Sequence, residues 1–186
     1  MHKIETKIGI INKSKGSAFF KCNTTSVICT VDINNRHEQM RSEEYDRLII
    51  DVRYRNINKK SYDKHFTHIV RNIIQECVLN IDICKSLFVN LIIDSSSSNT
   101  LWCAINAVFL GLSECGIPLK GLYYASTGFT DKEDVFVYDS NDNLVWYHAF
   151  CDIEDLDTKN ISDYYKYVKE IQDFTIRNNL VLKSIQ

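Results

Sequence analysis

The chain has 186 residues, of which 45% are hydrophobic and 25% are charged, and its formal net charge is −2. This length can bury a sizeable core, and the composition is that of an ordinary soluble globular protein. The near-neutral charge gives no general reason to expect a nucleic-acid partner, and no apolar run approaches the roughly 18–20 residues of a membrane span. We therefore expect no association with a membrane.

The charge is unevenly distributed along the chain. Residues 1–80 contain 14 Lys and Arg against 9 Asp and Glu, whereas residues 81–186 contain 8 against 15. Such asymmetry is consistent with one face for RNA or for assembly, although solvated faces explain most cases. Seven scattered cysteines with no C-x-x-C pair favour reduced, buried thiols over a zinc site. The N-terminus lacks an apolar segment with a small-residue cleavage site, so we expect a protein of the cytosol or nucleus.

The first quarter of the chain predicts a small antiparallel sheet. Short runs rich in β-branched and aromatic residues alternate with polar turns. We expect strands at Ile4–Ile11, Ser17–Cys22, Ser26–Ile33 and Leu48–Tyr54. The stretch Asn34–Asp46 shows no hydrophobic period and is expected to form a loop.

A basic segment, expected to be a loop over Arg53–Lys60, precedes the first predicted helix. That helix runs from about Tyr62 to Leu79 on apolar residues at helical spacing. The basic segment has one aromatic residue, Tyr54, among its cations. These cations are Arg53, Arg55, Lys59, Lys60 and Lys64. This pattern can follow a nucleic-acid backbone, and we identify it as the candidate RNA-binding segment. A solvated loop is the slightly favoured alternative.

The central part of the chain predicts a buried strand followed by a buried helix. The strand Leu87–Ile93 does not alternate strictly, which predicts cover on both faces. The helix, about Thr100–Glu114, has apolar residues on every side. Gly116 suits the left-handed residue after its end, and Pro118 prevents continuation. The polar run Asp94–Asn99 either caps the helix or binds an anion, and a cap is the favoured reading because Asp94 repels phosphate.

The last third predicts three short strands and a C-terminal helix. The strands are expected at Gly121–Phe129, Asp134–Tyr138 and Leu144–Phe150, and the helix at Asn160–Asn179. With one proline and six glycines there is no flexible linker. The whole pattern predicts an α+β fold in which sheet and helices form layers.

Few residues suggest a catalytic or metal-binding site. The aspartates that could include a magnesium pair also suit turns, and we expect no metal there. They are Asp131, Asp134, Asp139 and Asp142. The histidines His65, His68 and His148 have no nucleophile signature near them, so a hydrolytic triad is unsupported. No phosphate-binding glycine-rich loop is present, and no cofactor is expected.

Three segments resemble the RNase PH family, and specifically its exosome ring subunits. Gly16–Val31 is similar to the family's G-S-A…G-x-T-x-V…V hairpin, and His68–Cys77 resembles the helix with R-L-I-R-N. Ala104–Ala107, Gly111–Leu112 and Gly116–Leu119 are similar to the run A-x-I-N-A…A-L…A-G-I-P-M. The resemblance extends from about Ile8 to the C-terminal helix, and the central run is its most specific part.

The resemblance implies an RNase PH-like (ribosomal protein S5 domain 2-like) β-α-β fold, with a mixed sheet packed against helices in a single domain over residues 1–186. It implies RNase PH-like partners in a hetero-hexameric exosome ring, where subunits pair by extending their sheets edge to edge. It also implies cap subunits, an associated nuclease and RNA as further partners. Such a subunit would work in the nucleus, the nucleolus and the cytoplasm.

The chain departs from the phosphorolytic members of that family. Asn72 stands where they have a phosphate-binding arginine in the first helix, and Leu101 stands where their G-G-T-R stretch ends in arginine. Asp139 matches one of their acidic residues, but Leu144 and Val145 replace their Glu-Asp pair. Phosphorolysis needs cations for the anion and an acid or metal at the leaving oxygen. We therefore expect no catalytic residues and a structural subunit that organises an RNA channel. A divergent phosphate-dependent 3′-to-5′ exoribonuclease, with Lys64 or Arg71 as substitute residues, is the alternative.

Overall fold

The computed structural model describes residues 3–35, 48–58, 64–79, 85–94, 100–127, 134–148 and 158–185, with backbone only for residues 35, 158–160 and 180–185. Strands and helices follow the chain in the order β1 (Ile4–Ile8), β2 (Gly16–Cys22), β3 (Thr25–Asn35), β4 (Ile49–Asn56), α1 (Lys64–Cys77), β5 (Lys85–Asp94), α2 (Leu101–Cys115), β6 (Tyr123–Thr127), β7 (Val135–Asp139), β8 (Leu144–His148) and α3 (Thr158–Ile185). The predicted α+β class, with a mixed sheet packed against helices, is confirmed. None of the helices in these ranges is long and apolar enough to cross a membrane.

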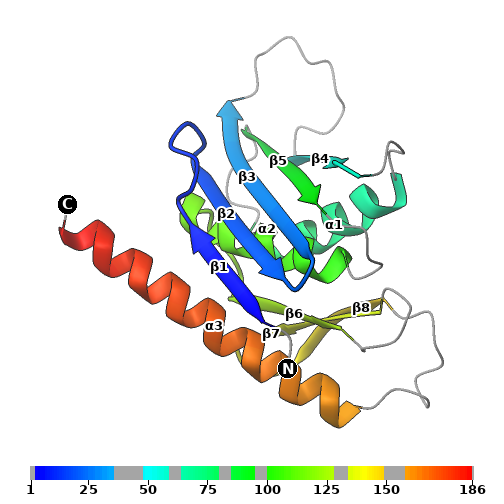
Figure 1. Cartoon of the computed structure of the whole chain (residues 1–186). Helices are drawn as coiled ribbons and strands as arrows, with labels where there is room; N and C mark the ends of the chain where they lie inside the picture. Colours follow the sequence, from blue (N-terminus) through cyan, green and yellow to red (C-terminus); the bar gives the residue numbers. More distant parts are fainter. Residues whose placement is uncertain are drawn as a thin grey trace.

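The larger sheet has five strands in the order β1-β2-β3-β5-β4 (Figure 1). The strands β1, β2, β3 and β5 pair antiparallel, whereas β4 pairs parallel with β5. The expectation that the fourth strand belongs to an antiparallel sheet of the first quarter is therefore wrong. A parallel pair needs a crossover connection, and α1 provides it by packing on β4.

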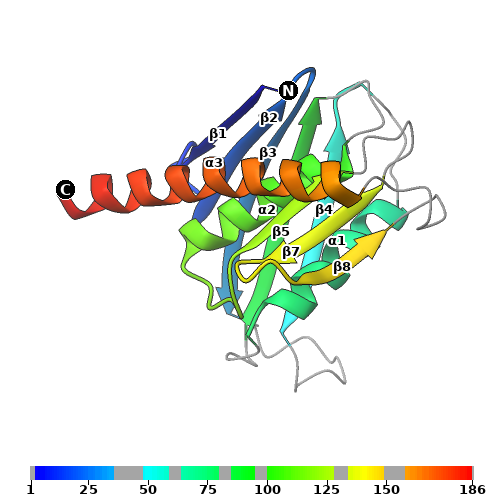
Figure 2. The same cartoon turned by 90° about the horizontal axis from the view of Figure 1, so that it is seen from below.

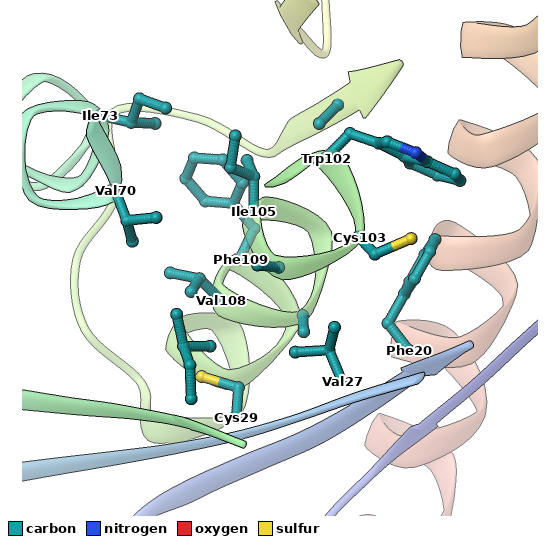
Figure 3. Packing of buried hydrophobic residues seen from close by; sticks show 14 of the residues in the cluster. Phe20, Val27, Cys29, Val70, Ile73, Trp102, Cys103, Ile105, Val108 and Phe109 are labelled. Carbon is teal, nitrogen blue, oxygen red and sulfur yellow. The ribbon is translucent and has the colours of Figure 1, made fainter. Parts of the chain in front are cut away.

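The helix α2 forms the centre of the core. All twelve residues from Leu101 to Leu112 are buried, and Phe20 packs edge-on against Trp102 with ring centroids 5.5 Å apart (Figure 3). The helix approaches β2 very closely, because a Cβ atom on Gly16 would lie 2.2 Å from the carbonyl oxygen of Gly111. Gly116 has φ 72°, so the predicted left-handed end of the helix is confirmed.

The strand β5 has one covered face and one open face. Leu87, Val89, Leu91 and Ile93 are at most 1% exposed on the side of the helices, while Ile92 on the other side is 42% exposed. The predicted cover on both faces is therefore wrong. Because the neighbouring strand β3 is antiparallel, the sheet needs helices on only one of its faces.

The smaller sheet, β6-β7-β8, is antiparallel and lies between α2 and α3. Tyr124 and Ser126 of β6 face α3, where the Tyr124 hydroxyl donates to Asp173 at 2.5 Å and the Ser126 hydroxyl donates to the carbonyl of Ile161 at 3.2 Å. The helix α3 crosses this sheet and continues past β1 (Figure 2). It is longer at both ends than the predicted helix.

Candidate functional site

The start of α2 is the first candidate position, because the sequence places a degenerate phosphate site there. Thr100 precedes the helix without a side-chain capping bond, and the first turn contains Leu101, Trp102, Cys103 and Ala104. Leu101 is only 2% exposed and belongs to the hydrophobic core. A buried aliphatic side chain cannot bind an anion, so position 101 acts in packing. Of the polar run Asp94–Asn99 that is predicted to cap the helix, residues 95–99 lie outside the described residues.

The helix α1 contains the second degenerate position, Asn72. Its amide nitrogen lies 3.2 Å from Nε2 of His68, one turn earlier. A neutral amide supplies no positive charge for a phosphate. Arg71 beside it is half-buried, and its Nε atom is buried without a hydrogen-bond partner among the residues that the structure describes. Arg71 is therefore the cation of α1 that points into the protein, whereas Lys64 is exposed at the start of the helix.

Two histidines that are distant in the sequence meet beside α1. The rings of His65 and His148 have centroids 5.7 Å apart, and Trp146 stacks on His148 at 6.1 Å. Asp134, which is fully buried, immediately precedes Val135, the partner of His148 in the sheet. Burial lowers the pKa of His148, the nearby His65 lowers it further, and the negative charge of Asp134 opposes both effects.

This cluster of two histidines and one aspartate is the strongest acid–base candidate in the described residues. A histidine whose pKa is lowered is neutral at physiological pH and can accept a proton. The sequence pattern did not indicate the cluster, because its members come from α1, the start of β7 and the end of β8. In the described part of the chain, no three His, Cys, Asp or Glu side chains, this cluster included, are placed so that they could hold a metal ion together.

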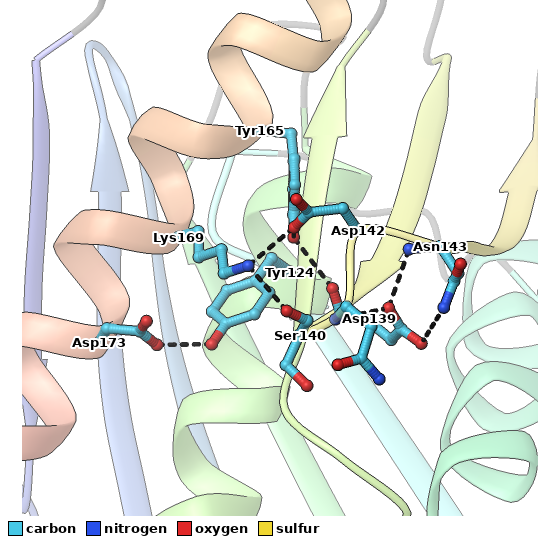
Figure 4. A network of polar contacts seen from close by, with 9 residues as sticks. Tyr124, Asp139, Ser140, Asp142, Asn143, Tyr165, Lys169 and Asp173 are labelled. Carbon is cyan, nitrogen blue, oxygen red and sulfur yellow. Dashed lines mark hydrogen bonds and ion pairs between the residues drawn. The ribbon is translucent and has the colours of Figure 1, made fainter.

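Two of the aspartates considered for magnesium hold the β7–β8 hairpin together (Figure 4). The carboxylate of Asp139 accepts hydrogen bonds from the backbone of Asn141 at 2.8 Å and of Asn143 at 2.9 Å, and from the Asn143 amide at 3.0 Å. These bonds, led by the one from the Asn143 side chain, hold the pKa of Asp139 below its usual value. Asp142 accepts from Tyr165 and from Lys169, each at 2.7 Å.

Both carboxylates are therefore occupied by contacts that shape the hairpin and attach it to α3. Asp131 lies outside the described residues. Leu144 and Val145, which replace an acidic pair, are 49% and 42% exposed on β8.

The candidate RNA-binding cations do not form one loop. Arg53 and Arg55 belong to β4, which continues to Asn56 by pairing with β5, so the predicted loop boundary at Arg53 is wrong. Both arginines are exposed, and Arg53 binds Asp51 through Nε and Nη2, each at 3.2 Å. Tyr54 between them points to the opposite face and stacks on Phe66 of α1.

Lys64 begins α1, on the face of the sheet to which Tyr54 points. Lys59 and Lys60 lie outside the described residues. The described cations of the candidate segment are thus divided between the two faces of β4.

The comparisons with known proteins agree with this fold. The structure is similar to rice (Oryza sativa) Rrp46, with a TM-score of 0.76, 17% identity and 94% of each chain covered. The resemblance of the sequence to ribosomal RNA-processing protein 46 among the ring subunits agrees with this match. An archaeal exosome core subunit follows with a TM-score of 0.69 and 16% identity, over 93% of this chain and 86% of that one.

A third similar structure is a chain of the Archaeoglobus fulgidus exosome with RNA bound to the active site. The TM-score is 0.63 at 18% identity, and the match covers 98% of this chain and 87% of that one. A comparison with curated proteins finds no significant match. The model of the 3′ exoribonuclease family, domain 1 (RNase PH), matches residues 1–118, which is more than half of the sequence. The chain therefore belongs to the RNase PH family of 3′ exoribonucleases.

Proposed function

We propose that this protein is a catalytically inactive RNase PH-like subunit of an exosome core ring. It would support 3′-to-5′ RNA processing and degradation by organising the RNA channel rather than by cleaving RNA. The observation that carries the proposal is the burial of Leu101, at 2% exposure, in the place where phosphorolytic relatives are expected to have an arginine. Transfer to phosphate needs a cation that binds the attacking anion, and this side chain is part of the core instead.

Two further observations support membership of a ring. The likeness to rice Rrp46 extends over 94% of both chains, which supports a subunit of the same kind. In addition, β8 is the edge of its sheet, contains no Asp, Glu, Lys or Arg, and exposes apolar side chains on both of its faces. Such an edge favours pairing with a strand of another chain.

An RNA contact is part of the proposal, with Lys64 as its described residue and Lys59 and Lys60 as its neighbours in the sequence. Arg53 contributes less, because Asp51 already neutralises it. Lysines contact phosphates without reading bases, which suits a channel that passes any sequence. On the same basis we expect cap subunits and an associated nuclease as further partners. We also expect the subunit to work in the nucleus, the nucleolus and the cytoplasm.

The divergent phosphorolytic exoribonuclease is the competing function, and the cluster of His65, His148 and Asp134 is the observation in its favour. The test is the phosphate-dependent release of nucleoside diphosphates from RNA by the purified protein, with a phosphorolytic family member assayed in parallel. We expect no release. Release by the wild-type protein that is lost in Asp134→Asn and in His148→Gln would establish the enzyme instead.

Ring membership is tested separately, by affinity purification from the source cells and identification of the proteins that co-purify. We expect several other RNase PH-like chains in stoichiometric amounts. The RNA contact is tested in the reconstituted ring by reversing Lys59, Lys60 and Lys64 to glutamate, with Arg53→Glu as a control. Loss of the three lysines should weaken RNA binding and lower its salt dependence, by at most about one unit of slope per lost phosphate contact.

A further inference from the structure

The face of the five-stranded sheet that α1 and α2 leave open has one mixed row of side chains. The strand register places Lys7, Phe19, Ile28, Ile92 and Arg55 next to one another, one from each strand. In Figure 1 this open face is turned to the reader, and β2 and β3 pass in front of α2. The row is therefore an apolar centre of three residues with a cation at each end.

The apolar centre is unusual for a sheet face without helices. Phe19 and Ile28 are half-buried and Ile92 is 42% exposed, although the solvent face of an antiparallel sheet is normally polar. On the opposite face, the neighbouring residues Ala18, Val27 and Ile93 are completely buried. The three apolar residues of the open face thus lie together on adjacent strands and within reach of a partner.

The acidic residues of this face already have partners. Glu5 lies 3.3 Å from Lys3, and Asp51 lies 3.2 Å from Arg53. Asp94 accepts a hydrogen bond from the Asn58 amide at 2.8 Å, and Asp32 accepts one from the backbone N–H of Lys15 at 3.1 Å. The two ion pairs reduce the negative potential that would otherwise oppose an acidic ligand.

The remaining cations are not compensated in this way. Lys7, Lys21 and Arg55 form no ion pair with another side chain in the described part of the chain. Lys21 neighbours Glu5 in the register, and Lys7 and Arg55 end the apolar row. The open face therefore combines an apolar centre with unpaired positive charge around it.

We propose that this face binds an acidic, amphipathic segment of a partner protein. Its apolar side chains would pack on Phe19, Ile28 and Ile92, and its carboxylates would meet Lys7, Lys21 and Arg55. Nucleic acid is a poorer fit, because single-stranded bases stack on exposed aromatic rings and this centre has two aliphatic residues and one half-buried ring. The proposal goes beyond ring membership, since it concerns the face of a sheet and not the edge at β8.

The test places a photo-crosslinking amino acid at position 92 of the full chain in the source cells and identifies the crosslinked peptide by mass spectrometry. We expect an adduct with a protein segment that is rich in Asp and Glu and has apolar residues at regular spacing. Crosslinking at position 174 of α3, where Phe174 is 67% exposed, is the control and should not yield that segment. An RNase-sensitive adduct, a peptide of this same chain, a basic or neutral segment, or no adduct would each overturn the proposal.

The charges are tested by combining the photo-crosslinker with Lys7→Glu, Lys21→Glu and Arg55→Glu. The yield of the adduct should fall about tenfold or more, because the rim charges that attract the segment would repel it. The matched control reverses three lysines elsewhere, Lys13, Lys120 and Lys166, which are exposed, and it should leave the yield unchanged. Thermal unfolding of both triple variants checks that the fold is intact. Equal yields in the two triple variants would contradict the role of the charges.

Discussion

Asn106 of α2 forms two hydrogen bonds with the backbone of Ala125 on β6. Its Nδ2 donates to the carbonyl oxygen at 2.9 Å, and its Oδ1 accepts from the N–H at 2.8 Å. Gln172 of α3 donates to the same Oδ1 at 2.6 Å, and both side chains are almost completely buried. Because β6 is at the edge of its sheet, Asn106 supplies the partners that another strand would supply. One amide thereby joins α2, β6 and α3.

Asn106→Leu should lower the free energy of unfolding by about 2–5 kcal/mol. Leucine has a similar volume, but it leaves the N–H and the carbonyl of Ala125 buried without partners, at a cost of about 1–3 kcal/mol each. Urea denaturation measures the change. Ser113→Ala on the same helix is the control, because the Ser113 hydroxyl only bonds to the carbonyl of Phe109 in its own helix, and it should cost less than about 1 kcal/mol. Equal losses in the two variants would show that the bonds of Asn106 have no special role.

Gly16→Ala should also destabilise the protein, by about 2 kcal/mol or more. The new Cβ atom would lie 2.2 Å from the carbonyl oxygen of Gly111 and 2.8 Å from Cβ of Cys115, so β2 and α2 would have to separate. Gly121→Ala is the matched control, because no atom of the described residues lies within 4 Å of its added Cβ, and its stability should stay within about 1 kcal/mol of wild type. Thermal unfolding of the two variants checks both values. A Gly16→Ala variant as stable as the wild type would mean that β2 and α2 move apart at little cost in free energy.

The elements that the sequence predicted well depend on local signals. The burial of α2 follows from apolar residues on every side of the helix, and its end follows from Gly116 and Pro118. The motif around Asn106 also indicated the family. Its physical role became clear only with β6 and α3 in place, because both partners of Asn106 come from elements that follow it in the chain.

The features that the sequence did not predict depend on contacts between distant segments. The parallel pairing of β4 with β5 needs the crossover through α1, and no local pattern in Ile49–Asn56 distinguishes it from an antiparallel strand. The approach of His65 to His148 likewise depends on where α1 and β8 lie. The ion pair between Asp51 and Arg53 is local to β4, but it forms because an extended strand places residues i and i+2 on the same face. Charge counts along the sequence cannot show which cations already have partners.

His148 should make the stability of the protein depend on pH. Burial and the neighbouring His65 lower its pKa in the folded state below the ordinary value of about 6.5. Between the folded and the unfolded pKa the unfolded chain binds more protons, so stability is lost as the pH falls below about 6.5. Urea denaturation should therefore give the wild type a lower free energy of unfolding at pH 5.5 than at pH 7.5. The same difference should be smaller in His148→Gln.

The effect of His65 provides an independent check of this assignment. His65→Gln removes the neighbouring histidine that lowers the pKa of His148, so an NMR titration should show the pKa of His148 closer to its ordinary value in this variant. A His148 pKa at or above 6.5 in the wild type would contradict the burial that the structure shows for this ring.

The edge strand β8 should make the isolated protein prone to self-association. Leu144, Val145 and Tyr147 are 49%, 42% and 52% exposed, and the strand has no charged residue to prevent pairing with another edge. We expect oligomers at high concentration in sedimentation velocity experiments, and we expect Val145→Lys combined with Tyr147→Lys to keep the protein monomeric and to weaken its binding to other RNase PH-like chains. Phe174→Lys is the control. Phe174 is 67% exposed, but it lies on a helix, whose backbone groups are not available to pair with a strand. A wild-type protein that stays monomeric at high concentration and does not bind other RNase PH-like chains would remove this support for a ring subunit.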